Sequence, residues 1–410
     1  MNGAEPTPLR RNRDFTLLQL GQGLSTLGAQ TSAIAYPLLV LALTGSPAKA
    51  GLVGFARLIP YPVFVLVAGV VVDRLDRRRV MIVADVVRLV AVATIVAGLW
   101  LGNLGLTQIA IVAFVEGTAF AFFNIAEIGA LRAVVATRQL PAAAAVEQAR
   151  LSSVVLAGPP LGGFLFGLGR SVPFLVDAIS YLFSLASIVA MRTPFQEARV
   201  EPRQRIRRDV AEGFAWLWRQ AFLRTCALLF AASNFAWEAL FLLFVVTARA
   251  QGLASGEIGV LIAVFGGASL LGSLLAPRMQ RLLSMRTIVV GNLWLGLGVL
   301  AFVVEPSVYV LLAGAIPAAL LGPTLNATII GYRVAVTPDR LQGRVTSVAR
   351  LLSFSAAPLG PLAAGLLLES YSPRQTVAVL GLWFAAIAAF ASFSRPMRDA
   401  PSLSELSPTA

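Results

Sequence analysis

Apolar runs long enough for membrane-crossing helices follow one another along almost the whole chain. A helix needs about 20 apolar residues to cross ~30 Å of hydrocarbon. Residues 51–72 contain one charge, Arg57, and residues 80–106 contain only Asp85 and Arg88. Of the 410 residues, 13% are charged and 57% are hydrophobic, whereas soluble proteins carry about 25% charged residues. The chain is therefore predicted to be a polytopic membrane protein.

Turn signals divide the apolar runs into separate predicted helices. Thr44-Gly-Ser-Pro47, Gly102-Asn103 and Glu305-Pro306 are residue combinations that favour helix ends. We therefore predict an all-α integral membrane protein with twelve transmembrane helices. The predicted spans cover residues 14–43, 48–73, 79–101, 105–135, 141–168, 172–192, 222–249, 256–282, 286–304, 308–336, 342–369 and 374–394.

Basic residues indicate which helix ends face the cytoplasm. The predicted inner segments contain clusters such as residues 74–79 and 192–224, whereas each predicted outer loop holds one basic residue at most. Positive charge concentrates in cytoplasmic loops, so both termini are expected in the cytoplasm and the protein in the cell inner (cytoplasmic) membrane. The net charge of +13 then reflects topology and predicts no nucleic-acid partner.

The longest polar break, residues 193–221, separates two predicted six-helix bundles. A shift of 201 residues, from 132 to 333, superimposes Arg132 on Arg333 without gaps, and also Pro160-Leu-Gly-Gly163 on Pro361-Leu-Ala-Ala364. This similarity favours a pseudo-symmetric duplication; chance similarity between helices rich in small residues is the alternative. The predicted parts are a cytoplasmic tail (1–13), an N-terminal bundle (14–192), a cytoplasmic linker (193–221), a C-terminal bundle (222–395) and a cytoplasmic tail (396–410).

The linker contains one further predicted helix. Val210, Phe214, Leu217 and Trp218 share one helical face. Such a face suits an amphipathic helix on the inner membrane surface, and a solvated linker helix is the alternative.

The residue types present exclude several kinds of chemistry. The chain has one cysteine, Cys226, and no histidine, so neither a disulfide framework nor a metal site is expected. It lacks a Gly-x-x-x-x-Gly-Lys-Ser/Thr loop and shows no nucleophile constellation, so we expect neither an enzyme nor a bound cofactor. Without histidine, any proton-coupled step must use carboxylates.

A highly charged turn joins the second and third predicted spans. It reads Gly69-Val-Val-Val-Asp-Arg-Leu-Asp-Arg-Arg-Arg79. The order resembles the loop between helices 2 and 3 of the major facilitator superfamily of transporters, and an ordinary arginine-rich inner loop is the alternative. Asp76 departs from the family pattern, which usually has a second glycine there.

The resemblance implies that this turn takes part in gating. When the inner side is closed, Asp73 would meet the backbone amides near Gly343 and the side chain of Arg132. The other gating residues implied by the resemblance are Gly69, Arg74, Arg77 and Arg78.

The fifth predicted span contains Gly158-Pro159-Pro-Leu-Gly162-Gly163. Proline kinks a helix and glycine permits close helix packing, so ordinary small-residue packing is one explanation. The pattern also resembles the motif of major facilitator proton antiporters, which favours export. Over nearly its whole length the chain is similar to the branch that includes enterobactin exporters and macrolide efflux pumps.

Charged residues inside the spans are functional candidates, because each is costly in a membrane unless it is paired or faces water. Asp85 and Arg88 lie three residues apart and could pair. Asp177 is placed near the outer end of its span, where water would reach it. The remaining intramembrane charges are Arg57, Glu116, Glu127, Arg150, Glu238 and Arg350.

Three carboxylates are the candidates for proton coupling: Glu238 first, then Glu127 and Glu116. Family members often have a buried arginine in the middle of helix 4, and this chain has none there. Permanent pairing of Glu238 with Arg350 or Arg57 is the alternative. Polar and aromatic residues suit a cavity for a large, partly apolar solute, or they form interhelical hydrogen bonds. The cavity candidates are Gln22, Gln30, Arg57, Asn124, Asn234, Trp237, Asn326 and Arg350.

The resemblance predicts a monomeric secondary active transporter of the lipid bilayer. It would export small organic molecules, such as a drug, macrolide or siderophore-like compound, by proton antiport with alternating access. An importer or uniporter of the same fold is one alternative, and a non-transporting membrane sensor or scaffold is another.

Overall fold

The computed structural model describes residues 8–195 and 206–400, and side chains in all of these except 206–209. Twelve of the described helical segments are long and apolar enough to cross a membrane, which confirms the predicted fold class. Most predicted boundaries lie within a few residues of the observed ones. The crossing segments are Arg13–Thr44, Pro47–Arg74, Arg77–Trp100, Leu106–Val134, Thr137–Leu168, Val172–Ala190, Ala221–Ala250, Ser255–Leu282, Met285–Val304, Val308–Val336, Asp339–Ser370 and Pro373–Phe393.

Nine of these segments are, apart from short 3-10 turns, single helices. They are α1 (Arg13–Thr44), α4 (Arg77–Trp100), α5 (Leu106–Val134), α6 (Leu140–Leu168), α7 (Val172–Ala190), α9 (Ala221–Ala250), α10 (Ser255–Leu282), α13 (Val308–Val336) and α16 (Pro373–Phe393). Two of the predicted turn signals hold left-handed glycines, Gly45 with φ 65° and Gly102 with φ 71°.

Three spans that the sequence predicts as continuous helices are interrupted. The second consists of α2 (Pro47–Leu58) and α3 (Pro60–Arg74), because Pro60 has no N–H to continue the hydrogen-bond ladder. The ninth consists of α11 (Met285–Leu295), a 3-10 helix (Gly296–Leu300) and α12 (Ala301–Val304). The eleventh breaks between α14 (Gln342–Phe354) and α15 (Leu359–Ser370). Hydropathy predicts the length of a span and not its local hydrogen bonding.

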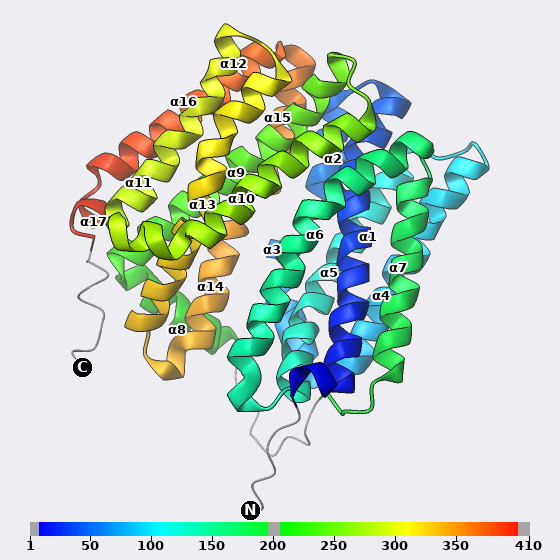
Figure 1. Ribbon diagram of the computed structural model, residues 1–410, viewed down its shortest axis with the longest axis vertical. Helices are drawn as coiled ribbons and strands as arrows, with labels where there is room; N and C mark the ends of the chain where they lie inside the picture. The colour runs from blue at the N-terminus through cyan, green and yellow to red at the C-terminus, as the bar shows by residue number, and fades with distance from the viewer. Residues whose placement is uncertain (1–7, 196–205, 401–410) are drawn as a thin grey trace, which may run out of the picture. The chain divides into compact units, whose positions relative to one another are not determined.

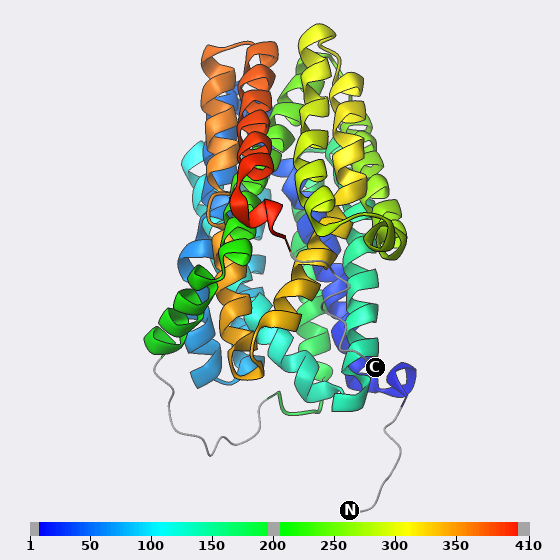
Figure 2. The same ribbon diagram turned by 90° about the vertical axis from the view of Figure 1, so that its left-hand side faces the viewer.

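The helices form two compact units. The first comprises Met1–Leu43, Ala56–Pro202 and Ala254–Ala263, and the second comprises Thr44–Phe55, Arg203–Leu253 and Val264–Ala410. In the first unit, α1, α4 and α7 run side by side (Figures 1 and 2). The bundle boundaries expected from the sequence, 14–192 and 222–395, stay a prediction.

Each unit has its own apolar core. The first core lies between α1, α4, α5 and α7 and includes Leu18, Met81, Phe123 and Ile188. The second core lies between α9, α11, α14 and α16. It includes Cys226, Ile288, Val345 and Ala388.

The predicted linker helix is present as α8 (Ile206–Arg219). Leu217 is buried in the core of the second unit. Phe214 and Trp218 stack on each other at 5.1 Å and stay exposed. Glu212 accepts a hydrogen bond from Arg344 on α14, which ties α8 to the second unit. Contact of the exposed aromatic pair with the membrane surface stays a prediction.

Asp76 begins α4 in place of the glycine that is usual in the resembling family. Its backbone is extended, with φ −62° and ψ 119°, and its carboxylate accepts a hydrogen bond from the Arg79 amide at 2.9 Å. Asp76 is therefore the N-cap of α4. The turn needs no left-handed residue at this position, so an aspartate is compatible with it.

Replacing Asp76 with alanine is expected to destabilise the protein by about 1 kcal/mol, because an N-terminal amide of α4 loses its acceptor. Asp76→Asn keeps an acceptor oxygen and should behave like the wild type, and Asp76→Gly should cost only a few tenths of a kcal/mol. The measurement is the thermal unfolding midpoint of the detergent-purified protein. A loss in Asp76→Asn as large as that in Asp76→Ala would show that capping is not the cause.

Candidate functional site

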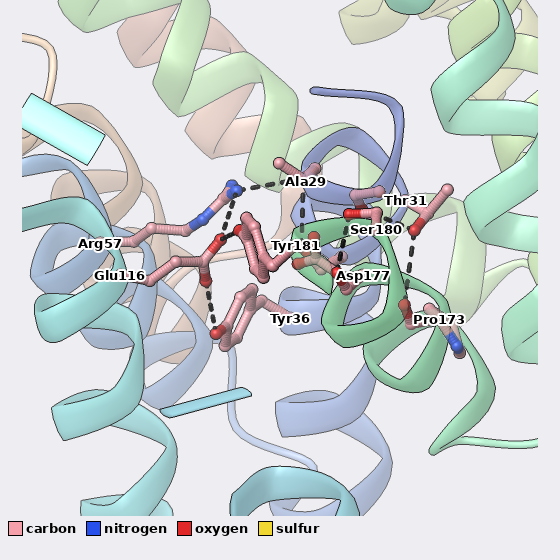
Figure 3. Close-up of polar contacts among 11 residues, drawn as sticks. Ala29, Thr31, Tyr36, Arg57, Glu116, Pro173, Asp177, Ser180 and Tyr181 are labelled. Carbon is pink, nitrogen blue, oxygen red and sulfur yellow. Dashed lines mark hydrogen bonds and ion pairs between the residues drawn. The ribbon is translucent and has the colours of Figure 1, made fainter. Parts of the chain in front are cut away.

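Ionisable side chains gather inside the first unit. Their helices turn these side chains inward, because an unpaired charge facing lipid is costly. We call the group the buried charge cluster, and Figure 3 shows part of it. The cluster consists of Tyr36 on α1, Arg57 on α2, Asp85 and Arg88 on α4, Glu116 on α5, and Asp177 and Tyr181 on α7.

Glu116 is the most connected carboxylate of the cluster. It is 4% exposed, and it accepts hydrogen bonds from the hydroxyls of Tyr36 at 2.8 Å and Tyr181 at 3.3 Å. The Arg57 guanidinium lies 3.7 Å from it (Figure 3). Two hydroxyl donors and one cation therefore surround the Glu116 carboxylate.

Close backbone contact brings Arg57 to Glu116. A Cβ on Gly117 would stand 2.1 Å from the Arg57 carbonyl oxygen, so only glycine fits there. The Arg57 guanidinium also donates to the Ala29 carbonyl on α1 at 3.2 Å and lies 5.4 Å from the Tyr36 ring centroid. Arg57 therefore links α1, α2 and α5.

Asp85 and Arg88 form the ion pair that their spacing predicts. Their side chains are 2.5 Å apart and nearly inaccessible to solvent. Ser184 donates to the second oxygen of Asp85 at 2.6 Å, and Gln22 donates to Ser184 at 3.0 Å. Gln22, a predicted cavity residue, thus lies inside the unit in an interhelical hydrogen bond.

Asp177 corrects an expectation from the sequence. We expected water to reach it near the outer end of its span, but its exposure is 0%. Gly28 on α1 explains the burial, because a Cβ at Gly28 would stand 2.2 Å from the Ser180 hydroxyl and 3.0 Å from Asp177 Cα. The glycine lets α1 lie directly against α7 and exclude water. Position along a helix could not reveal this contact.

Glu127, the second coupling candidate, is also paired. It lies on α5, and its carboxylate accepts a hydrogen bond from Arg150 on α6 at 2.9 Å. Both side chains are largely buried. Asn124, one turn away, is half-buried on the same helix.

Glu238, the first coupling candidate, lies on α9 in the second unit and is half-buried. A Cβ on Gly360 of α15 would stand 2.9 Å from Glu238 Cβ, so the two helices are in close contact at this residue. Asn234 donates to the Ser353 carbonyl at 2.9 Å. The Trp237 ring lies between Phe265 and Phe384, at 5.6 and 5.5 Å. Two further cavity candidates, Asn326 and Arg350, are exposed.

The predicted gating residues lie at helix ends of the first unit. Asp73, Arg74 and Arg132 are exposed, and no Cβ at Gly69 would meet a neighbour within 4 Å. The guanidinium groups of Arg77 and Arg78 donate to carbonyls at the end of α7 and beyond it. Their acceptors are Phe195 at 3.3 Å for Arg77, and Val189 at 2.6 Å and Met191 at 2.8 Å for Arg78. The gating contact of Asp73 stays a prediction.

The glycines of the predicted antiporter motif pack against neighbouring backbones. A Cβ on Gly158 would stand 2.4 Å from Gln30 Cβ, and one on Gly162 would stand 2.6 Å from the Thr31 carbonyl oxygen. Gly163 faces Ser255 on α10 in the same way, at 2.2 Å from its carbonyl oxygen. Pro159 lies inside α6, which continues to Leu168.

Sequence reasoning missed the tyrosines of the buried charge cluster. Tyr36 and Tyr181 are 80 and 65 residues from Glu116 in the chain, so no local pattern connects them. A signal was available in the small residues of the first span. Gly21 and Gly28 are one heptad apart and face Ser187 and Ser180 on α7. Within the described residues, no group of three or more His, Cys, Asp or Glu could hold a metal ion.

Twelve described helical segments long enough to cross a membrane, with buried ion pairs, are the features of a multi-pass membrane transporter. Residues 4–407 match the family described as transmembrane secretion effector. The chain therefore belongs to this major facilitator family, which confirms the resemblance stated above; these proteins are transporters and not enzymes.

Curated relatives extend over most of the chain. The multidrug efflux pump Tap of Mycolicibacterium fortuitum is 28% identical over 386 residues, 91% of this chain and 93% of that protein. The multidrug efflux pump Tap of Mycobacterium tuberculosis (strain ATCC 25618 / H37Rv) is 28% identical over 385 residues, 88% of each chain.

Solved structures share the fold. A bacterial homolog of the human lysosomal transporter Spinster, inward-facing and occupied, has a TM-score of 0.73 at 14% identity, over 94% of this chain and 97% of that one. The nucleoside transporter NupG has a TM-score of 0.73 at 11% identity, over 95% and 100%. At these identities the similarity shows the fold alone.

Proposed function

We propose that this protein exports small organic molecules across the cytoplasmic membrane by proton antiport with alternating access, as a monomer with both termini in the cytoplasm. The observation that carries the proposal is Glu116, an almost fully buried carboxylate held by two tyrosines and an arginine. When a buried carboxylate binds or releases a proton, its charge changes by one unit. Inside a membrane protein such a change has a large energetic effect, because an unpaired charge there is costly.

Protonation of Glu116 would act on the contact between three helices. The ionised carboxylate attracts Arg57 at 3.7 Å, and Arg57 also holds α1 through the Ala29 carbonyl. A proton on Glu116 removes that attraction and leaves the guanidinium to find another partner. The change in charge thus becomes a change in the contacts of α1, α2 and α5, which is the kind of two-state element that coupling requires.

Export is favoured over import by two observations. The Gly158 to Gly163 segment resembles the antiporter motif, and its glycines make the close contacts with α1 and α10 that such a motif would need. The relatives that cover most of the chain are called multidrug efflux pumps. A drug-like substrate is consistent with the aromatic surroundings of Trp237. Glu238 and Glu127 remain proposed secondary coupling sites, and Glu127 is paired with Arg150 at 2.9 Å.

Inverted membrane vesicles test the proposal. With an acidic lumen, adding a transported drug should drive protons out of the lumen as the drug enters. Glu116→Gln keeps the side-chain shape but cannot ionise, and we expect it to abolish this drug-dependent proton release. Glu305→Gln removes an exposed carboxylate and should leave the release unchanged.

Three outcomes separate the functions. Drug-dependent proton release that persists in Glu116→Gln would remove Glu116 from the mechanism. Drug movement without proton movement would indicate a uniporter. A wild-type protein that moves none of a broad panel of drugs, macrolides and siderophores would favour a sensor or scaffold.

A further inference from the structure

The buried charge cluster contains one more acid than base. Its carboxylates are Asp85, Glu116 and Asp177, and its guanidinium groups are Arg57 and Arg88. Arg88 pairs with Asp85 at 2.5 Å and Arg57 with Glu116 at 3.7 Å. Asp177 is left as the third acid.

Neither guanidinium group of the cluster is paired with the Asp177 carboxylate. Both oxygens are buried without a hydrogen-bond partner. Ser180 donates to the backbone carbonyl of Asp177 at 2.7 Å and not to its side chain (Figure 3). The Ser32 hydroxyl also reaches the Asp177 side chain, but it lies 3.1 Å from the Ala29 carbonyl, and its single proton can serve only one of the two acceptors at a time.

The groups that act on Asp177 come from five helices. They are the hydroxyls of Tyr36 on α1 and Tyr181 on α7, the cations Arg57 and Arg88 on α2 and α4, and the anion Glu116 on α5. Each cation already has a closer carboxylate. An ionised Asp177 would therefore be a buried and unpaired charge, which costs far more than a neutral acid.

We propose that Asp177 carries a proton in the resting protein and is a second, resident proton-binding site for the transport cycle. The neutral acid fits its surroundings, because its O–H can donate to a lone pair of the Ser32 hydroxyl. One added proton also balances the cluster, with two guanidinium groups, two carboxylates and one neutral acid.

The proton on Asp177 would be transferred to Glu116. In the step of the transport cycle in which Glu116 is protonated, the proton leaves the Asp177 carboxyl group and binds the Glu116 carboxylate. Total charge is conserved within the cluster, and no oxidant or other reactant is needed. Tyr181 lies one turn after Asp177 on α7; its hydroxyl donates to Glu116 at 3.3 Å, and it interacts electrostatically with Asp177. This role of Asp177 rests on the proposed proton antiport, whereas its protonated state does not.

Infrared spectroscopy of the wild-type protein tests the protonated state directly. A protonated carboxyl group has a C=O stretch above the amide bands. Protein grown with aspartate labelled with carbon-13 at its carboxyl group should shift that band to lower frequency, which assigns the band to an aspartate and not to Glu116. The band should also be absent from Asp177→Asn. Absence of an aspartate-derived acid band at neutral pH would overturn the proposal, with no transport needed.

Transport tests the second part. In proteoliposomes with a pH gradient, the probe is the cationic dye ethidium. Asp177→Asn resembles the protonated acid, so we expect the folded protein to persist while gradient-driven dye accumulation falls at least tenfold. Dye exchange at equal pH on both sides should continue. Glu305→Gln is the matched control and should accumulate dye like the wild type.

The outcomes are distinguishable. If Asp177→Asn accumulates dye with the wild-type rate and pH dependence, Asp177 is not part of the coupling. If the wild-type protein moves no dye in either assay, the proposed export of this cation fails, and the infrared band alone decides whether Asp177 holds a proton.

Discussion

Replacing Asp85 with alanine is expected to destabilise the protein by about 3–5 kcal/mol, because the Arg88 guanidinium would remain buried without its counter-charge. Arg88 is 4% exposed and bonds to Asp85 at 2.5 Å. Its guanidinium also lies over the rings of Phe123 at 4.3 Å and Tyr181 at 4.8 Å, which fixes it in the interior. The measurement is the thermal unfolding midpoint of the purified protein, with the exposed Glu305→Ala as control.

A double substitution separates charge from packing. Asp85→Leu together with Arg88→Met removes both charges and keeps apolar volume, and methionine packs well against aromatic rings. Replacing a whole buried ion pair by hydrophobic residues is often neutral, so the double variant should recover most of the lost stability. A double variant as unstable as Asp85→Ala would show that the hydrogen bond from Ser184, and not the charge of Arg88, explains the loss.

The sequence predicted those structural features that depend on residues close together in the chain. The length of an apolar run reports a membrane span because the bilayer sets the length of helix that it needs. The three-residue spacing of Asp85 and Arg88 predicted their pair because both lie on one helical face. The Gly-rich segment of α6 predicted close helix contact for the same reason, and Gly158 shows that contact with Gln30.

Features that depend on distant partners could not be predicted. Asp177 appeared wettable from its position along α7, but Gly28 on α1 brings a whole helix against it. Glu116 was a candidate because a charge inside a span needs a partner. The identity of those partners, Tyr36 and Tyr181, depends on how α1 and α7 rotate about their axes. Hydropathy contains no information on that rotation.

The close contact between α6 and α1 at Gly162 predicts that a larger residue there impairs transport. Gly162 is buried, and a Cβ there would stand 2.6 Å from the Thr31 carbonyl oxygen and 2.8 Å from Thr31 Cα. Both are backbone atoms, so α1 and α6 must separate to make room even for alanine. Overpacking of this kind typically costs about 1–3 kcal/mol.

We expect Gly162→Ala to lower drug-driven proton release by about tenfold to a hundredfold while the protein still reaches the membrane, because each ~1.4 kcal/mol at a required step is a factor of ten in rate. Gly162→Leu should abolish it. Gly167→Ala is the matched control on the same helix, since a Cβ at Gly167 would meet nothing within 4 Å. Equal transport by Gly162→Ala and Gly167→Ala would show that the glycine motif has only a packing role. A helix contact that tolerates an added methyl group cannot be a close contact that the transport cycle requires.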